Sequence, residues 1–203
     1  MTTADQTTRE TVDPLLSPDN CALVIIDFQP IQVTSIASMD RRELVSNVVA
    51  VAKTAELFAL PVVISTVNVE TGFNKPTIRQ LREIFPNVPT VDRTTLNAWE
   101  DARFRKAVEA TGRKKLVVVA LWTEVCLTFP VLSALASGYE VYPVVDAVGG
   151  TSVTAHSAAL KRVIQAGARP VSWVQLICEL QRDWNRHTTA QRFAEILFAV
   201  EGQ

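Results

Sequence analysis

The sequence predicts an α/β protein with a doubly wound, mostly parallel β-sheet flanked by helices on both faces. Two observations lead to this prediction. Short, almost continuously apolar runs recur along the 203 residues, as expected for strands that are buried on both faces. Between these runs lie longer stretches in which apolar residues repeat at helical spacing. Alternation of the two patterns is typical of a three-layer α/β/α arrangement.

The first half of the chain contains three predicted strands and two predicted helices. Residues 21–28 (CALVIIDF) form a nearly continuous apolar run, which predicts a buried strand. Residues 41–60 carry apolar side chains at helical spacing, and a second strand is expected at 61–67, where a proline opens the run. A short helix at 81–85 and a short strand at 88–91 follow.

The second half of the chain continues the alternation. Residues 101–111 predict a helix, because Asp101 suits a helix N-terminus and Gly112 suits the residue just past its end. Residues 115–121 (KLVVVAL) predict another fully buried strand. The remaining expected elements are a helical stretch ending near Ser137 and Gly138, strands at 140–145 and 169–173, and helices at 157–166 and 188–200.

The domain organisation is simple. Residues 1–18 predict a mobile N-terminal arm, and residues 19–203 predict a single domain large enough to bury a hydrophobic core. The first twenty residues are polar and do not resemble a secretion signal. The longest apolar runs are far shorter than a membrane span, so no membrane partner is expected.

Charge and cysteine content narrow the class of protein further. With 20 basic and 21 acidic residues the formal net charge is −1, which gives no reason to expect a nucleic-acid partner. The three cysteines, Cys21, Cys126 and Cys178, are an odd number without a CxxC pair. This pattern argues against a disulfide scaffold and a zinc knuckle, and it favours the cytoplasm.

Three side chains are expected at the carboxyl edge of the sheet, where ligands bind in doubly wound folds. Asp27 closes an apolar strand, and it is either a functional carboxylate or a helix cap or structural ion pair. Arg93 follows the short strand and also suits this edge.

Cys126 is the third side chain expected at this edge, because it follows the strand at 115–121 by a tight turn. If it begins a helix, the helix dipole lowers its thiol pKa and backbone N–H groups face the sulfur; otherwise it is a small buried hydrophobe. Pro130 requires either a kinked helix or a separate turn that holds Cys126.

Other chemistries find no support in the sequence. The two histidines, His156 and His187, do not follow predicted strands, and His156 is expected to face solvent at the start of a helix. No HxxxH or DxH spacing suggests a metal site, and no GxGxxG or GxxxxGK[ST] motif suggests a bound nucleotide. The sequence therefore predicts a site without a metal or another cofactor.

Four segments resemble the isochorismatase-like cysteine hydrolases, in particular the YcaC-like branch of that family. They are VIIDFQ at 24–29, VDRTTLNAW at 91–99, WTEVCLTFPVLSALASGYEVYPVVDA at 122–147 and CELQRDW at 178–184. The resemblance implies a catalytic triad of Asp27, Arg93 and Cys126. It also implies a cis peptide at Trp122–Thr123, with backbone N–H groups near Thr123 and Cys126 forming an oxyanion hole.

The sequence departs from parts of that family in informative ways. Amidase members generally carry Lys where this chain has Arg93, and arginine cannot shuttle a proton. The nicotinamidases bind zinc through a DxH pair, whereas residues 66–72 (TVNVETG) contain no histidine. Isochorismatases proper lack the cysteine. These differences argue against nicotinamide hydrolysis and against the isochorismatase reaction.

The resemblance therefore implies hydrolysis of a small amide, imide or related C–N bond through a thioester to Cys126, with Asp27 as general base. Gln29, Phe28 and Trp99 are expected to contact the substrate, with Trp122 as a further wall, although a surface amide and core aromatics are the alternatives. A homo-oligomer, either a tetramer or an octamer, is also implied.

Two other functions remain open for the same fold. A reactive cysteine is also what oxidants attack, so the chain is alternatively a redox- or electrophile-sensing protein. The replacement of Lys by Arg93 alternatively marks a non-catalytic subunit of an oligomer.

Overall fold

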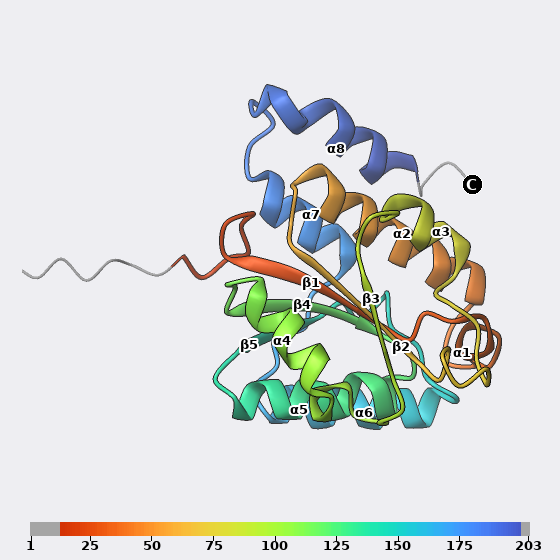
Figure 1. Cartoon of the computed structure of the whole chain (residues 1–203). Coiled ribbons are helices and arrows are strands. Elements are labelled where there is room, and N and C mark those ends of the chain that lie inside the picture. Colours follow the sequence, from red (N-terminus) through yellow and green to blue (C-terminus); the bar gives the residue numbers. More distant parts are fainter. Residues whose placement is uncertain (1–12, 200–203) are drawn as a thin grey trace, which may run out of the picture.

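The computed structural model describes residues 13–199 and contains one five-stranded parallel sheet (Figure 1). The strands are β1 (Cys21–Ile26), β2 (Val62–Val67), β3 (Thr90–Arg93), β4 (Lys115–Ala120) and β5 (Glu140–Pro143). Every neighbouring pair is parallel, so the predicted fold class is confirmed.

The strand order β3-β2-β1-β4-β5 determines where a ligand can bind. The chain adds β2 and β3 on one side of β1, then crosses back to add β4 and β5 on the other side. The order of strands reverses between β1 and β4, and the crevice beyond their carboxyl ends is the usual ligand position in such sheets. Ile26 pairs with Ala120 at this point, so Asp27 and the turn after β4 leave the sheet side by side.

Each face of the sheet builds its own hydrophobic core. Along β1, Leu23 and Ile25 enter one core, whereas Val24 and Ile26 enter the other, as the two-residue period of a strand requires. All six residues of β1 are buried, which explains the absence of polar alternation in its sequence.

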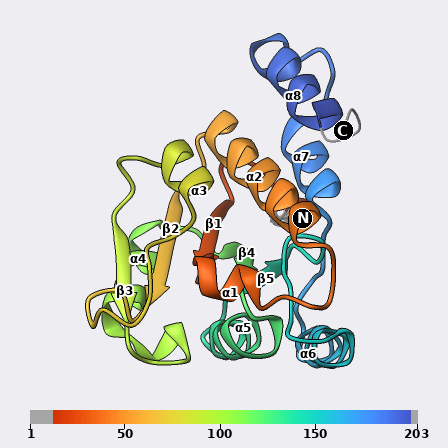
Figure 2. The same ribbon diagram turned by 90° about the vertical axis from the view of Figure 1, so that its right-hand side faces the viewer.

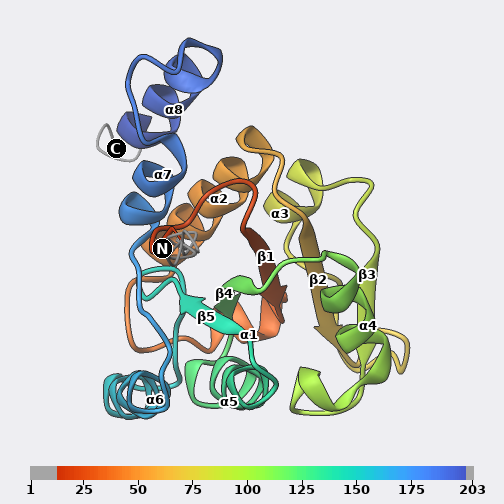
Figure 3. The ribbon, with the colours of Figure 1, turned by 90° about the vertical axis from the view of Figure 1, so that its left-hand side faces the viewer.

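Helices cover both faces (Figures 2 and 3). One core contains side chains of α2 (Arg41–Leu57), α3 (Arg79–Ile84), α7 (Trp173–Gln181) and α8 (His187–Ala199). The other contains side chains of α4 (Ala102–Ala110), α5 (Thr128–Ala136) and α6 (Val153–Gln165). Three short turns complete the chain, namely α1 (Pro30–Thr34), the 3₁₀ turn η1 (Ala98–Glu100) and the π-helical turn η2 (Thr123–Leu127).

Local sequence signals account for several helix ends. The Asp101 carboxylate accepts hydrogen bonds from the backbone N–H groups of Arg103 and Phe104, which confirms its expected place at the start of a helix. Gly112, just after α4, has φ +66°, a left-handed conformation that glycine adopts without a Cβ clash. In residues 13–199, none of the helices combines the length and the apolar character needed to cross a membrane.

The strand expected at 169–173 is wrong. Only a single bridge between Val144 and Val171 forms there. Pro170 has no N–H to donate to a ladder, and the Ser172 hydroxyl accepts from the N–H of Gln175, which starts α7 instead.

The boundary of the expected N-terminal arm also changes. Residues 1–12 lie outside the described residues, but residues 13–18 pack on the domain rather than forming part of an arm. Leu16 is fully buried, and the Lys115 ammonium donates to the carbonyl oxygens of Asp13 at 2.7 Å and Leu15 at 2.9 Å. Lys115, the first residue of β4, therefore anchors this segment to the sheet.

Candidate active site

The three predicted catalytic residues line one pocket of about 320 Å³ at the carboxyl edge of the sheet. Asp27 follows β1, Arg93 ends β3, and Cys126 lies in η2 after β4. The other lining residues are Ile31, Gln32, Val67, Asn68, Phe73, Asn74, Leu96, Trp122 and Val125. The strand-order reversal thus brings together side chains that are up to 99 positions apart in sequence.

Asp27 has an unusual backbone conformation that suits its position. Its φ of 59° lies in the left-handed region, which aspartate tolerates better than most side chains. The Asp27 N–H donates to the Ser65 carbonyl at 3.0 Å, so the residue still continues the pairing of β1 with β2. The left-handed turn directly after Ile26 ends the strand and leaves the carboxylate among the pocket residues.

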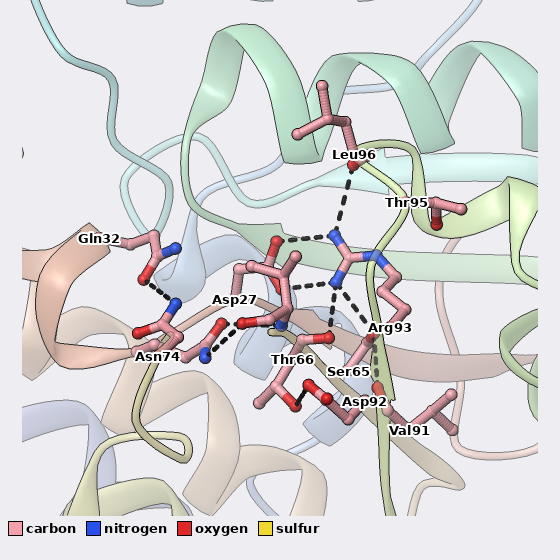
Figure 4. Close-up of polar contacts among 12 residues, drawn as sticks. Asp27, Gln32, Ser65, Thr66, Asn74, Val91, Asp92, Arg93, Thr95 and Leu96 are labelled. Carbon is pink, nitrogen blue, oxygen red and sulfur yellow. Dashed lines mark hydrogen bonds and ion pairs between the residues drawn. The ribbon is translucent and has the colours of Figure 1, made fainter. Parts of the chain in front are cut away.

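Asp27 and Arg93 form a closed ion pair with both side chains fully buried. Arg93 Nη1 donates to Asp27 Oδ1 and Arg93 Nη2 to Asp27 Oδ2, each at 2.7 Å (Figure 4). This two-pronged geometry is the strongest form of carboxylate recognition by arginine. Burial acts to lower the pKa of Arg93, but the hydrogen bonds and charge of Asp27 outweigh it and raise that pKa.

Further hydrogen bonds fix the guanidinium. Nη1 also donates to the Thr66 carbonyl at 3.0 Å and contacts the Ser65 hydroxyl at 3.3 Å, and Nη2 reaches the Leu96 carbonyl at 3.4 Å (Figure 4). A lysine has a single ammonium group and could not donate to all of these acceptors at once. Arg93 is therefore a structural cation as well as a neighbour of Cys126.

Cys126 is almost fully buried, with 6% of its surface exposed. Burial raises its pKa, the Asp27 charge and hydrogen bond raise it further, and Arg93 only partly opposes these effects. Of the two alternatives left by the sequence, a thiol whose pKa is lowered by a helix N-terminus and a small buried side chain, the structure favours the second in its burial and in the direction of the pKa shift. The resting thiol is neutral and lies next to a carboxylate that can accept its proton.

Of the two alternatives for Pro130, a kinked helix or a separate turn that holds Cys126, the structure shows the separate turn. Cys126 lies in a separate π-helical turn, and α5 starts two residues later at Thr128. Pro130 falls in the first turn of α5, where a missing N–H costs no intrahelical hydrogen bond.

The cis peptide is Leu121–Trp122, so the expectation of Trp122–Thr123 is wrong by one residue. Leu121 still belongs to the sheet edge, because its N–H donates to the Ile26 carbonyl and it bridges Gly149. The turn therefore begins at Trp122 rather than at Thr123. The backbone of Trp122 acts to lower the pKa of Cys126, whereas the Thr123 N–H is committed to the Gly149 carbonyl at 2.9 Å. Thr123 thus cannot serve as the expected oxyanion donor.

The structure does not place the three expected substrate contacts in the pocket. Phe28 is fully buried in the core beside α2. Gln29 is also buried, and its amide donates to the Val67 and Lys75 carbonyls and accepts from the Val67 N–H. Trp99 packs edge-on against Phe104 and Tyr139.

The pocket instead contains side chains that the sequence did not single out. Ile31, Phe73 and Leu96 form apolar walls, and Gln32, Asn68 and Asn74 contribute amides. Ile31 and Gln32 could have been found, since they directly follow the strand-end motif that contains Asp27. The segment 68–74 carries no periodicity, so nothing in the sequence indicated that it folds over the site.

Below Cys126, a polar cluster holds η2 in place. The Glu124 carboxylate accepts from the Thr151 N–H at 2.9 Å and from its hydroxyl at 2.6 Å. The Thr123 hydroxyl lies 2.9 Å from His156 Nδ1. His156 is half-buried rather than solvent-facing as expected, and burial lowers its pKa, which favours the neutral imidazole.

The other two cysteines have different surroundings. Cys21 is fully buried, and burial raises its pKa to about 12. Cys178 is exposed and lines a separate pocket between α7 and α8. Within residues 13–199, no group of three His, Cys, Asp or Glu side chains is arranged to hold a metal ion.

A doubly wound sheet with an Asp, Arg and Cys at its switch point defines a class of protein, and comparisons identify it. Residues 21–175 match the model of the isochorismatase domain, and the chain belongs to the isochorismatase family. It is 38% identical over 171 residues to the Escherichia coli K12 protein named "Probable hydrolase YcaC". That match covers 83% of this chain and 81% of the relative.

Two solved structures agree with this assignment. YcaC from Pseudomonas aeruginosa, described with hexane-2,5-diol and covalent acrylamide, is 32% identical with a TM-score of 0.83. Escherichia coli YcaC, described as an octameric hydrolase of unknown specificity, is 31% identical with a TM-score of 0.83. Each match covers 94% of this chain and 98% of the other. The YcaC-like resemblance inferred from the four sequence segments is confirmed.

Proposed function

We propose that this protein is a cysteine hydrolase that cleaves an amide, imide or related C–N bond of a small molecule through a thioester to Cys126. The observation that carries the proposal is the Cys126 thiol next to the Asp27 carboxylate in a pocket of about 320 Å³. Similarity to proteins named as hydrolases supports the same class of reaction.

The first step transfers the thiol proton as the sulfur attacks. A carboxylate has about four lone-pair sites, so the Asp27 oxygens can accept the Cys126 proton while each still accepts from Arg93. The sulfur bonds to the substrate carbonyl carbon, and the carbonyl oxygen becomes an oxyanion. Because the resting thiol is neutral, the reaction depends on a base at this position. A positioned base contributes roughly 100- to 10,000-fold in rate.

The oxyanion needs a nearby donor or positive charge. The Trp122 N–H, whose backbone acts to lower the Cys126 pKa, is one proposed donor, and the Cys126 N–H is the second. Arg93 does not transfer a proton; its role is to hold Asp27 in place and to offset negative charge near the sulfur.

The second half of the reaction restores the enzyme. The C–N bond breaks and the departing nitrogen takes the proton held by Asp27, which leaves a thioester on Cys126. Asp27 then removes a proton from water as the water attacks the thioester carbonyl. The products are a carboxylic acid and an amine or ammonia, and the Cys126 sulfur regains its proton.

A screen of small carboxamides and imides tests the proposal. Amine release by the wild-type protein, absent in Cys126→Ala, is the expected result. Because Cys126 is buried but its truncation removes only a sulfur atom, the variant should keep its fold, as circular dichroism will show. Full activity of Cys126→Ala on a confirmed substrate would eliminate the thioester mechanism.

The structure gives less support to a redox sensor. Such a sensor needs an exposed thiol of low pKa, whereas Cys126 is 6% exposed and burial raises its pKa. Cys178 shares no pocket with Cys126, so no resolving partner lines the site among the residues described.

We also propose that the chain forms a homo-oligomer. Escherichia coli YcaC is described as an octamer. Away from the pocket, this chain exposes large apolar side chains, among them Trp184 and Phe198, which an assembly would cover.

A further inference from the structure

The charges in the Cys126 pocket cancel. Only three of its twelve lining residues can ionise, namely Asp27, Arg93 and Cys126. Asp27 and Arg93 neutralise one another in the buried pair, and the thiol is neutral at rest. The pocket therefore presents no net charge to an entering molecule.

No cationic donor in the pocket is available to a substrate anion. Both terminal nitrogens of Arg93 are committed to Asp27 and to the backbone. Its Nε lacks a partner among the described residues, but it is buried and a molecule in the pocket cannot reach it. A carboxylate that entered would lose its hydration without gaining an ion pair, and such a loss is costly.

The mouth of the pocket is apolar. Ile31, Phe73 and Leu96 come from three different segments and are 60%, 88% and 66% exposed. Trp122 and Val125 add apolar surface closer to Cys126. Such walls favour a short hydrocarbon substituent on the molecule that they enclose.

A relay of hydrogen bonds orients the Gln32 amide. The Lys75 N–H donates to Asn74 Oδ1 at 2.9 Å, so the other end of the Asn74 amide must be its nitrogen. Asn74 Nδ2 donates to Gln32 Oε1 at 3.2 Å, which leaves Gln32 Nε2 as the free end (Figure 4). Gln32 is buried and lines the pocket, and within residues 13–199 its Nε2 donates to no side chain or carbonyl.

We infer that the pocket selects small, uncharged carbonyl compounds with an apolar substituent, and that Gln32 Nε2 donates a hydrogen bond to them. This inference rests on the proposed role of Cys126 as the reacting thiol and names the substrate class. Neutral carboxamides fit the site, whereas the corresponding carboxylates are excluded. Gln32 thus takes the substrate-contacting role that Gln29, whose amide is used internally, cannot fill.

Competing alkylation of the full-length protein tests the selectivity. Iodoacetamide and iodoacetate share a leaving group and differ in charge, and exposed Cys178 provides an internal reference in the same molecule. Peptide mass spectrometry gives the labelling rate at each cysteine. The ratio of iodoacetamide to iodoacetate rates should be at least about tenfold larger at Cys126 than at Cys178. Equal ratios, or no labelling of Cys126 by either reagent, would overturn the inference.

Two variants test the donor. Gln32→Leu should slow iodoacetamide labelling of Cys126 by about two- to tenfold, the effect of one hydrogen bond, without changing Cys178. Gln32→Glu keeps the side-chain size and the oxygen that accepts from Asn74, and it should slow the labelling of Cys126 by a similar factor. A packing defect in the leucine variant could not explain slow labelling in both variants. Gln191→Leu, an exposed amide on α8, is the matched control. An unchanged Cys126 rate in both Gln32 variants contradicts the assignment.

The readout also separates this inference from the proposed function. Alkylation requires only entry and a reactive thiol, whereas hydrolysis requires acyl transfer as well. Selective labelling without hydrolysis of any amide would therefore contradict the proposed function alone. Hydrolysis of carboxamides and of charged analogues at equal rates would contradict the inference alone.

Discussion

At the scale of single residues, the site depends on a charge pair that is buried before any substrate arrives. Asp27 and Arg93 satisfy one another through two 2.7 Å hydrogen bonds. A pair of this kind adds little net stability over apolar packing, but removing one partner leaves a buried charge uncompensated. The same carboxylate therefore has two roles, since it holds the fold together locally and is the proposed base for Cys126.

The variant Asp27→Asn tests both roles. Asparagine tolerates the left-handed backbone, so φ need not change. The unpaired Arg93 should lower the free energy of unfolding by about 3–5 kcal/mol. Loss of the base should slow acylation of Cys126 by roughly 100-fold or more. Urea denaturation and acylation kinetics measure the two effects, with exposed Asp19→Asn as control; unchanged values for Asp27→Asn would refute both roles.

The neutral thiol of Cys126 predicts a dependence of stability on pH. Its folded-state pKa is raised above the ordinary value of 9.0, so the unfolded chain loses this proton first. Stability from this group is complete below about pH 9 and falls as pH rises, by up to about 1.4 kcal/mol per pH unit. Between about pH 9 and pH 11, wild type should lose stability more steeply than Cys126→Ser. Parallel curves from denaturation at each pH would contradict the raised pKa.

The sequence identified the residues of this site better than it identified their surroundings. Asp27, Arg93 and Cys126 were found because each lies at the end of a predicted strand, and the topology brought those ends together. The direction of the Cys126 pKa shift could not be predicted, because it depends on burial by segments distant in sequence. Gln29 and Gln32 illustrate the same limit, since only the fold shows which amide has a free donor.

At the scale of elements, the turn η2 carries the proposed nucleophile and is hydrogen-bonded to the loop before α6. The Thr123 N–H donates to Gly149, and Glu124 accepts two hydrogen bonds from Thr151. Gly150 lies so close that an added Cβ would come within 2.6 Å of Glu124 Oε2. This packing leaves the turn little freedom, which suits a thiol that must meet both a base and oxyanion donors.

The variant Glu124→Ala tests whether the hydrogen bonds between Glu124 and Thr151 position the turn. Loss of the acceptor for Thr151 should lower the free energy of unfolding by about 1–2 kcal/mol. It should also slow acylation of Cys126, because the turn can then shift relative to Asp27. Glu124→Gln retains the Oε1 acceptor and is the matched control. Equal acylation rates in the alanine and glutamine variants would show that these hydrogen bonds do not position Cys126.

The predicted elements were correct where the apolar periodicity was strong, and they were wrong where helix capping or a turn determines the local structure. The apolar runs of β1, β2 and β4 and the long α2 follow directly from their sequences. The strand expected at 169–173 failed because Pro170 and Ser172 favour the start of α7. The π-helical turn η2 has no sequence signature, so Pro130 could indicate only that some irregularity lay nearby.

At the scale of the whole molecule, the isochorismatase fold places the proposed active site at one edge of the sheet. The helices on both faces bury the strands, and the pocket lies beyond the carboxyl ends of β1, β2, β3 and β4. Some of the exposed apolar side chains lie at the pocket mouth, whereas others, among them Trp184 and Phe198, lie in or just before α8.

This distribution predicts an assembly in solution. Light scattering coupled to size-exclusion chromatography should give a mass of four or eight chains, as the octameric Escherichia coli relative suggests. Polar substitutions of Trp184 and Phe198 should lower that mass, whereas exposed Gln191→Leu should not. A monomer at all concentrations would contradict the proposed oligomer.

The central claim is that Cys126 accepts an acyl group with Asp27 as the base, and trapping the acyl-enzyme tests it most directly. The full-length protein is treated with an uncharged activated acetyl ester, quenched with acid and analysed by peptide mass spectrometry. One acetyl group is expected on Cys126, formed much more slowly in Asp27→Asn and absent from Cys126→Ala. Acetylation of Cys178 with Cys126 unmodified, or equal rates with and without the Asp27 carboxylate, would contradict the account.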